Sequence, residues 1–197
     1  MLIQRTIVAV VAVGLFATVG FAQDGEVDER YRAFSVAMGS GTSGVLDIAI
    51  TRWTTEEERK TLVTSLMENG QEKTVDLLRK QKETGYIRTQ TGGGMRGWPS
   101  VRLHYAYQFP QQDGKRVVIL VTDRNIGMAE AMRNDKSVEY EISALVMELQ
   151  KNEDGKEEGQ GTLYLATKLG WDKEKQKLEV ESMGQQPIRL TDIKREK

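Results

Sequence analysis

Residues 101–122, VRLHYAYQFPQQDGKRVVILVT, carry a strand–turn–strand pattern from which the fold can be inferred. Apolar and polar residues alternate over residues 101–109, as in a strand with one buried face. Asp113 and Gly114 then form a tight-turn signal, and residues 117–121 are apolar throughout. We therefore expect an antiparallel hairpin whose second strand is covered on both faces.

Period-two apolar spacing recurs on both sides of this hairpin. In residues 137–149 the parity of the apolar positions switches near Ala144, which predicts a bulge or bend there. Together with residues 101–109 and 116–122 the chain offers about nine strands, enough for a curled sheet. The other expected strands are residues 31–38, 45–53, 85–89, 137–149, 162–169, 178–182 and 187–193.

Residues 55–81 break the strand pattern and predict a helical hairpin. Thr55 and Glu58 have the spacing of a capping box, in which the hydroxyl accepts from the N3 amide and the carboxylate reaches back. A helical apolar stripe follows, and Gly70 is expected to end the first helix. Val75 and Leu78 are the apolar positions of the second, shorter helix.

These elements predict an α+β protein that is mostly β. We expect a curled antiparallel sheet, either a barrel or a sandwich, with an inserted helical hairpin. Residues 31–197 contain no linker or repeat and are expected to form a single domain. Residues 23–30 are polar and acidic, and we expect them to be a flexible N-terminal segment.

Residues 1–22 have the pattern of a secretory signal peptide. Arg5 precedes an uncharged run over residues 6–21, and the small residues Gly20 and Ala22 flank Phe21 as in a cleavage site. The run is shorter than the roughly 20 residues that a membrane-spanning helix needs, which favours cleavage over the alternative of a retained anchor. We therefore expect a bacterial periplasmic or secreted protein without a stable membrane span after cleavage.

Composition argues against several functions. The chain has 28 Lys and Arg against 29 Asp and Glu, a balance that is atypical of a nucleic-acid-binding protein. It has one His and no Cys, which excludes Cys-ligated and multi-His metal sites. Residues 39–44 match G-x-G-x-x-G, but a strand pattern follows where a dinucleotide site needs a helix. The acidic turn at residues 152–158 lacks calcium-loop spacing. We expect no metal and no cofactor.

Three places carry candidate ligand-binding residues. A glycine-rich loop over residues 92–99 holds one pair, an aromatic strand face that could line a barrel cavity holds a second, and the end of strand 116–122 holds the third. The alternatives are a connecting loop, a core face and a structural ion pair, and His104 is expected to be solvated. The candidates are Arg96, Trp98, Tyr105, Tyr107, Asp123 and Arg124.

Four segments carry a resemblance to known proteins: WTTEEER at 53–59, GYIRT at 85–89, TDRNIG at 122–127 and PIRLT at 187–191. In this pattern the chain resembles a set of uncharacterised secreted bacterial proteins. The resemblance implies bacterial export. It implies no activity, because none is known for that set, and it assigns no site residue.

The sequence therefore favours a non-enzymatic exported domain that binds a small apolar ligand or a protein partner of the envelope. One alternative is a carboxylate-dependent envelope hydrolase, which two carboxylates facing each other in a cleft would favour. Another is an envelope assembly or structural factor, which an exposed apolar patch would favour.

Overall fold

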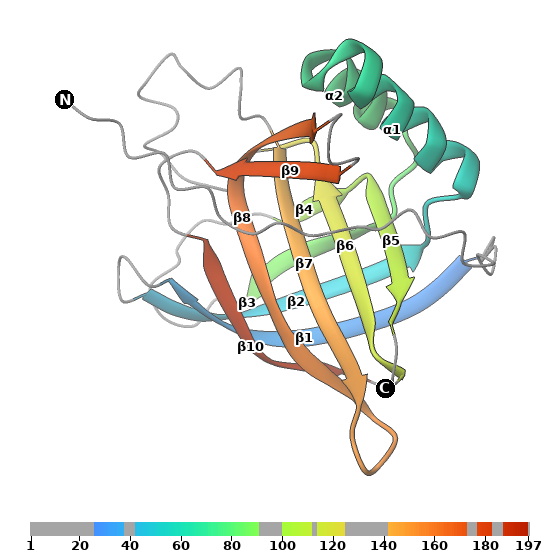
Figure 1. Ribbon diagram of the computed structural model, residues 1–197. Helices are drawn as coiled ribbons and strands as arrows, with labels where there is room; N and C mark the ends of the chain where they lie inside the picture. The colour runs from blue at the N-terminus through green and yellow to red at the C-terminus, as the bar shows by residue number, and fades with distance from the viewer. Residues whose placement is uncertain are drawn as a thin grey trace.

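Ten strands and two helices make up the part of the chain that the computed structural model describes, which is residues 26–37, 42–90, 100–111, 114–124, 142–172, 177–182 and 187–196 (Figure 1). The helices are α1 (Glu56–Asn69) and α2 (Gln71–Lys80). The strands are β1 (Glu26–Ala37), β2 (Thr42–Arg52), β3 (Gly85–Gln90), β4 (Val101–Leu103), β5 (Tyr105–Pro110), β6 (Arg116–Thr122), β7 (Ile142–Lys151), β8 (Glu157–Asp172), β9 (Lys177–Ser182) and β10 (Ile188–Arg195).

The strands form one antiparallel sheet that curls into a nearly closed barrel. Their order is β4-β3-β2-β1-β10-β8-β7-β6-β5, and β9 pairs with the far half of β8. Strands β1 and β2 run across β6, β7 and β8, so that the sheet folds over on itself (Figure 1). The expected mostly-β fold with an inserted helical hairpin is confirmed.

The two edges of the sheet meet where the chain passes from β4 to β5 through a single residue, His104. Thr54, which follows β2, bridges to β5: its amide donates to the Ala106 carbonyl at 2.8 Å, and its hydroxyl accepts from the Ala106 amide at 2.9 Å. The His104 amide donates to the Val121 carbonyl at 3.0 Å. These bonds satisfy backbone groups that an open sheet edge would expose.

Strand β6 is buried on both faces, as residues 117–121 predict. Val118 and Leu120 point into the barrel and belong to the inner core, which also holds Leu145, Met147 and Leu163. Ile119 and Val121, which alternate with these two residues along β6, face outward into a second core beneath the helices. This outer core includes Leu62, Val75, Leu78, Ile119, Val121, Ile142 and Ala144.

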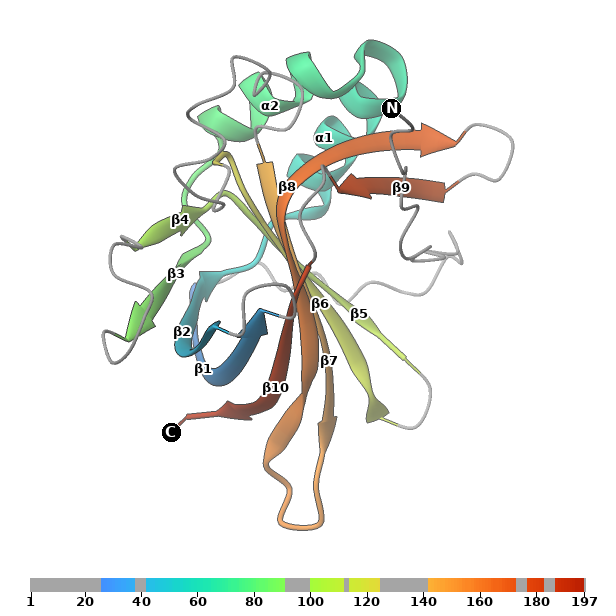
Figure 2. The same cartoon turned by 90° about the vertical axis from the view of Figure 1, so that its left-hand side faces the viewer.

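The helical hairpin begins and turns as the sequence predicts. Thr55 and Glu58 form the expected capping box, with the Glu58 amide donating to Thr55 Oγ1 at 3.2 Å and the Thr55 amide to Glu58 Oε2 at 2.9 Å. Gly70 ends α1 at a φ of 78°, which favours glycine, and α2 starts at the next residue. Figure 2 shows both helices at one end of the barrel, opposite the β7–β8 turn.

The expected long strand over residues 101–109 is wrong. β4 and β5 lie at opposite edges of the sheet, and the inward parity shifts between them: Val101, Leu103 and Ala106 face the inner core, whereas Tyr105 packs against the outer core. The alternation in the sequence continues across His104 because both faces of β5 contact apolar neighbours.

The structure also bears on the expected loose segment before β1 and on the expected bulge near Ala144. Strand β1 begins at Glu26, and Glu29 pairs with Ile50, so residues 26–30 are paired strand rather than a loose segment. The register between β7 and β8 shifts between Ile142 and Ala144, where the sequence predicts a bulge. The extra residue belongs to β8, because Ile142 pairs with Thr167 and Ala144 with Tyr164.

Residues 1–25, which include the expected signal peptide, lie outside the described residues. Across the described ranges, no helix has both the length and the apolar character needed to span a bilayer.

Burial of β6 on both faces predicts that both faces contribute to stability. Leu120→Ala and Ile119→Ala should each lower the free energy of unfolding by about 2–5 kcal/mol, since each leaves a cavity in one of the two cores. The control Phe34→Ala, at a side chain 42% exposed, should change it by no more than about 0.5 kcal/mol. Urea denaturation followed by circular dichroism measures all three. An Ile119→Ala cost equal to that of the control would contradict the outer core.

Candidate binding site

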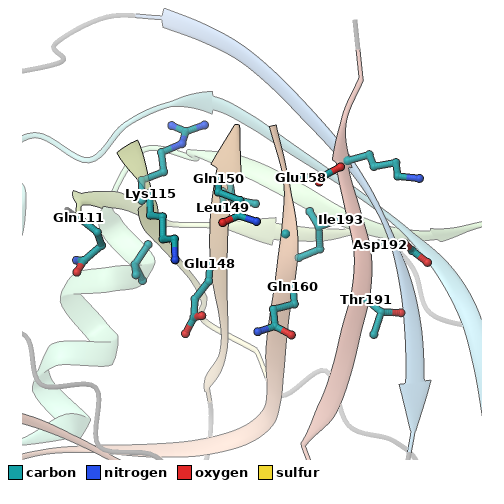
Figure 3. Close-up of a pocket in the computed structure, with 14 residues that line it drawn as sticks. Gln111, Lys115, Glu148, Leu149, Gln150, Glu158, Gln160, Thr191, Asp192 and Ile193 are labelled. Atoms are coloured by element: carbon teal, nitrogen blue, oxygen red, sulfur yellow. The ribbon is translucent and has the colours of Figure 1, made fainter. Parts of the chain in front are cut away.

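A hollow of about 930 Å³ opens beside the ends of four strands, β6, β7, β8 and β10 (Figure 3). We call it the β6–β10 hollow. Its lining residues are Gln111, Lys115, Arg116, Val117, Glu148, Leu149, Gln150, Glu158, Gly159, Gln160, Thr191, Asp192, Ile193 and Lys194. Most of these side chains have the outward parity of their strands, and Val117 also borders the outer core, so the hollow begins where the helix-covered surface ends.

Strand register places the outward side chains of the hollow in a cross-strand row. Val117 of β6 pairs with Glu148 of β7, which pairs with Gln160 of β8. Thr191 of β10 follows, and it pairs with Phe34 of β1. Directly paired side chains lie about 4.5–5.5 Å apart, so neighbours in this row can contact the same ligand. Figure 3 shows Glu148 and Gln160 extending from adjacent strands.

Irregular backbone shapes the floor of the hollow. A Cβ atom on Gly159 would lie 1.9 Å from the Glu148 carbonyl oxygen, so only glycine permits this close approach of β8 to β7. On the other side, β10 carries a bulge: Leu190 pairs with Gly161 and Ile193 with Gly159. Asp192, inside the bulge, has a φ of 49°, which is uncommon for a residue other than glycine. Bulges of this kind re-aim side chains and often lie next to functional sites.

Polar side chains in the hollow are available to a ligand. Within the described ranges, no hydrogen bond or ion pair to another residue engages the side chains of Lys115, Glu148, Gln150, Asp192 and Lys194. They supply amide, carboxylate and ammonium groups, so the hollow can both donate and accept hydrogen bonds.

Beneath the hollow, five side chains from four strands form a network that we call the Arg116 cluster: Glu29, Tyr31, Arg116, Glu157 and Arg195. The Arg195 side chain is 40% exposed, and the others are largely buried. Arg116 Nη2 donates to Glu29 Oε2 at 2.7 Å and to Glu157 Oε2 at 2.8 Å. Arg116 Nε lies 2.8 Å from Glu157 Oε1 without hydrogen-bond alignment. Arg195 adds an ion pair to Glu157 at 3.1 Å, so two guanidinium groups balance two carboxylates.

Tyr31 and Arg116 fix the charge of Glu29. Burial raises the pKa of Glu29, but hydrogen bonds from Arg116 and Tyr31 outweigh burial and hold the pKa below its usual value. Burial also raises the pKa of Tyr31, and the neighbouring Glu29 raises it further. Glu29 is therefore a carboxylate and Tyr31 a neutral donor at neutral pH, and the donor bonds to the carboxylate at 2.6 Å.

The candidates Tyr105 and Tyr107 do not line a cavity inside the barrel. They lie on the outer side of β5, with ring centroids 6.3 Å apart, and contact the helices. The Tyr107 hydroxyl donates to Glu56 of α1, and the Arg59 guanidinium lies 5.2 Å from the Tyr107 ring centroid. These two tyrosines hold α1 on the sheet.

Asp123 and Arg124 lie together just after β6, away from the hollow. Asp123 Oδ1 is 3.7 Å from His104 Nε2 and 3.9 Å from Arg124 Nε, and Asp123 Oδ2 is 3.9 Å from Arg79 Nε. The His104 side chain is 13% exposed and its Nδ1 lies 3.2 Å from the Gln81 carbonyl oxygen, so the expected solvated histidine is wrong. This group joins α2 to the end of β6. Arg96 and Trp98 lie outside the described residues.

Two features of the sequence point to the hollow and the Arg116 cluster, but neither feature is among the candidate residues predicted above. Arg116 and Glu157 are charged residues at inward positions of strands, with the same parity as Val118 and Leu163. Gly159 and Gly161 alternate within a strand, where glycine marks a close approach of another backbone. In the described part of the chain, no group of His, Asp and Glu side chains could hold a metal ion.

Comparisons with known proteins add no relative: the chain matched no family model, no curated protein and no solved structure.

The Arg116 cluster predicts acid sensitivity. Since the pKa of Glu29 is lower in the folded state, its contribution is fully present above the ordinary carboxyl pKa and is lost as pH falls through the lowered value. Glu29→Gln should cost about 3–5 kcal/mol at pH 7, because it leaves Arg116 without one of its partners. The difference from the unchanged protein should shrink as pH falls below the ordinary carboxyl pKa, because Glu29 of the unchanged protein is then progressively protonated. Urea midpoints at each pH measure it.

The matched control is Glu153→Gln, at an exposed carboxylate in the β7–β8 turn. It should leave the urea midpoint unchanged across the same pH range. A Glu29→Gln difference that stays constant with pH would contradict the assignment of a lowered pKa to Glu29.

Proposed function

We propose that this protein is an exported, non-enzymatic binding domain that takes its ligand in the β6–β10 hollow. One observation carries the proposal: an open hollow whose lining includes polar side chains without partners among the described residues. Polar groups that converge in a concavity on a rigid sheet support ligand binding. Export rests on the signal-peptide pattern of residues 1–22 and on the resemblance to secreted bacterial proteins.

The packing of the barrel interior supports an outer site over an inner one. Leu120, Leu145, Met147 and Leu163 are each at most 1% exposed and meet in the centre of the barrel. The Arg116 cluster occupies the end of the interior below them. A small apolar ligand would have to displace these side chains, whereas a polar ligand can enter the hollow without doing so.

The electrostatics of the carboxylate pair support binding over hydrolysis. Glu29 and Glu157 approach the same Arg116 nitrogen, which is the kind of carboxylate pair that a glycosidase needs. A general acid, however, needs a raised pKa, and the pKa of Glu29 is lowered. Both carboxylates also pair with Arg116 and Arg195, so the cluster stabilises the fold instead of transferring protons.

Export is tested by processing. When the full chain is produced in a Gram-negative host, the periplasmic fraction should contain a protein whose first residue is Gln23, read by N-terminal sequencing. Ala22→Arg should block the cleavage, because the −1 position requires a small residue. A full-length chain that stays in the cytosol would contradict the proposal of export.

Native mass spectrometry of the purified protein tests ligand binding. The protein purified from its own envelope compartment should show a mass excess in native spectra that disappears on denaturation. Glu148→Ala with Gln160→Ala should remove the excess, because both side chains line the hollow. The control pair Glu68→Ala with Glu72→Ala, at exposed helix positions, should keep it. A mass excess that persists in the hollow variant would place the ligand elsewhere, and a bare protein would contradict a retained ligand.

A further inference from the structure

We infer that the β6–β10 hollow together with Phe34 is a site for an uncharged oligosaccharide. This inference rests on the proposed binding function and names the class of its ligand. Its basis is the juxtaposition of an exposed aromatic ring with a row of amide and carboxylate side chains on neighbouring strands.

The strand pairing disfavours an extended peptide. Each strand beneath the hollow is paired on both sides: β6 by β5 and β7, β7 by β6 and β8, β8 by β7 and β10, and β10 by β8 and β1. The main chain of the hollow therefore offers no free edge onto which a peptide strand could add. Recognition must come from side chains that stand up from the sheet, which suits a ligand that carries its own polar groups on every side.

The charges of the hollow disfavour an anionic ligand. The lining contains two lysines, Lys115 and Lys194, and three carboxylates, those of Glu148, Glu158 and Asp192. Arg116, the remaining cation of the lining, is already paired with Glu29 and Glu157. A phosphate, a nucleic acid or an acidic polymer would meet net negative charge here.

The side chains of the cross-strand row match the hydroxyl groups of a sugar. Each hydroxyl both donates and accepts, so it can pair with a carboxylate such as Glu148 and an amide such as Gln160 at the same time. These two residues are direct partners on β7 and β8. Gln150 lies two residues further along β7 and adds a second amide to the lining.

Phe34 supplies the apolar face that a sugar ring also requires. Its side chain is 42% exposed, and it is the exposed large hydrophobic residue of the described chain. Phe34 pairs with Thr191, which lines the hollow, so the ring lies at the end of the polar row. The C–H face of a pyranose can pack on this ring while its hydroxyls reach the neighbouring strands.

The length of the row calls for several sugar units. It crosses from β6 to β1 over four strand spacings, about 19 Å at the usual distance between strands. We therefore expect an oligosaccharide to bind more tightly than the corresponding monosaccharide.

The test uses the full mature protein and an array of neutral and N-acetylated oligosaccharides, followed by calorimetric titration with the best-bound member. Phe34→Ala and Gln160→Ala should each weaken binding by about tenfold, through the lost ring contact and the lost hydrogen bonds. Phe34→Tyr should retain binding because it keeps the ring, and the control Glu72→Ala should match the unchanged protein. Equal melting temperatures show that the variants are folded.

Two outcomes would overturn the inference. No binding to any array member would overturn the saccharide class; if the hollow-dependent mass excess in native spectra is nevertheless present, the proposed binding function still holds. Saccharide binding that neither Phe34→Ala nor Gln160→Ala weakens would overturn the placement of the site. Absence of both saccharide binding and the mass excess in the unchanged protein would contradict the proposed function itself.

Discussion

Strand β6 is buried on both faces, and the positions of the helices and of the other strands follow from this burial. Val118 and Leu120 need a barrel to close around them, and Ile119 and Val121 need a cover on the outside. The helical hairpin supplies that cover, so its insertion between β2 and β3 serves a strand that lies far along the sheet. The cover stops near Val117, and the sheet surface beyond it is left open to solvent. The hollow is thus the uncovered continuation of a face whose other half is core.

Charge inside the barrel has a related explanation. Arg116 begins β6 with the same inward parity as Val118, so its guanidinium must be buried at the end of the inner core. Burying one charge without partners is costly. In the cluster, two carboxylates and the Tyr31 hydroxyl bond to the Arg116 guanidinium, and a second guanidinium balances the charge. Because Arg116 also lines the hollow, the floor of the candidate site is fixed by a charge-balanced network. Such support holds the strands of the candidate site in place, as a preorganised site would require.

Local rules predicted the elements whose determinants are local. The capping box at Thr55, the turn at Gly70 and the two-faced burial of β6 follow from spacing alone. The break at His104 could not be predicted in this way. Tyr105 continues the apolar alternation of Val101 and Leu103, but Tyr105 packs against the outer core whereas the other two face the inner core. The alternation therefore places Tyr105 and Tyr107 on an inner face, whereas the structure places them on the outer side of β5, next to α1. The cross-strand row has the opposite difficulty: its members come from five strands, and only register and the bulge at Asp192 bring them together.

Strand order also controls how the protein can assemble. β10 lies between β1 and β8, although it is the last strand along the described chain and β1 is the first. Strands β1 to β4 can pair with one another, as can β5 to β9, but the inner edges of the two groups have no partner until residues 188–195 are made. Such long-range pairing is slow, because the entropy of closing a long loop must be overcome before the contacts form. Until then the chain exposes two unpaired strand edges, and a newly made molecule is most prone to aggregation in that interval.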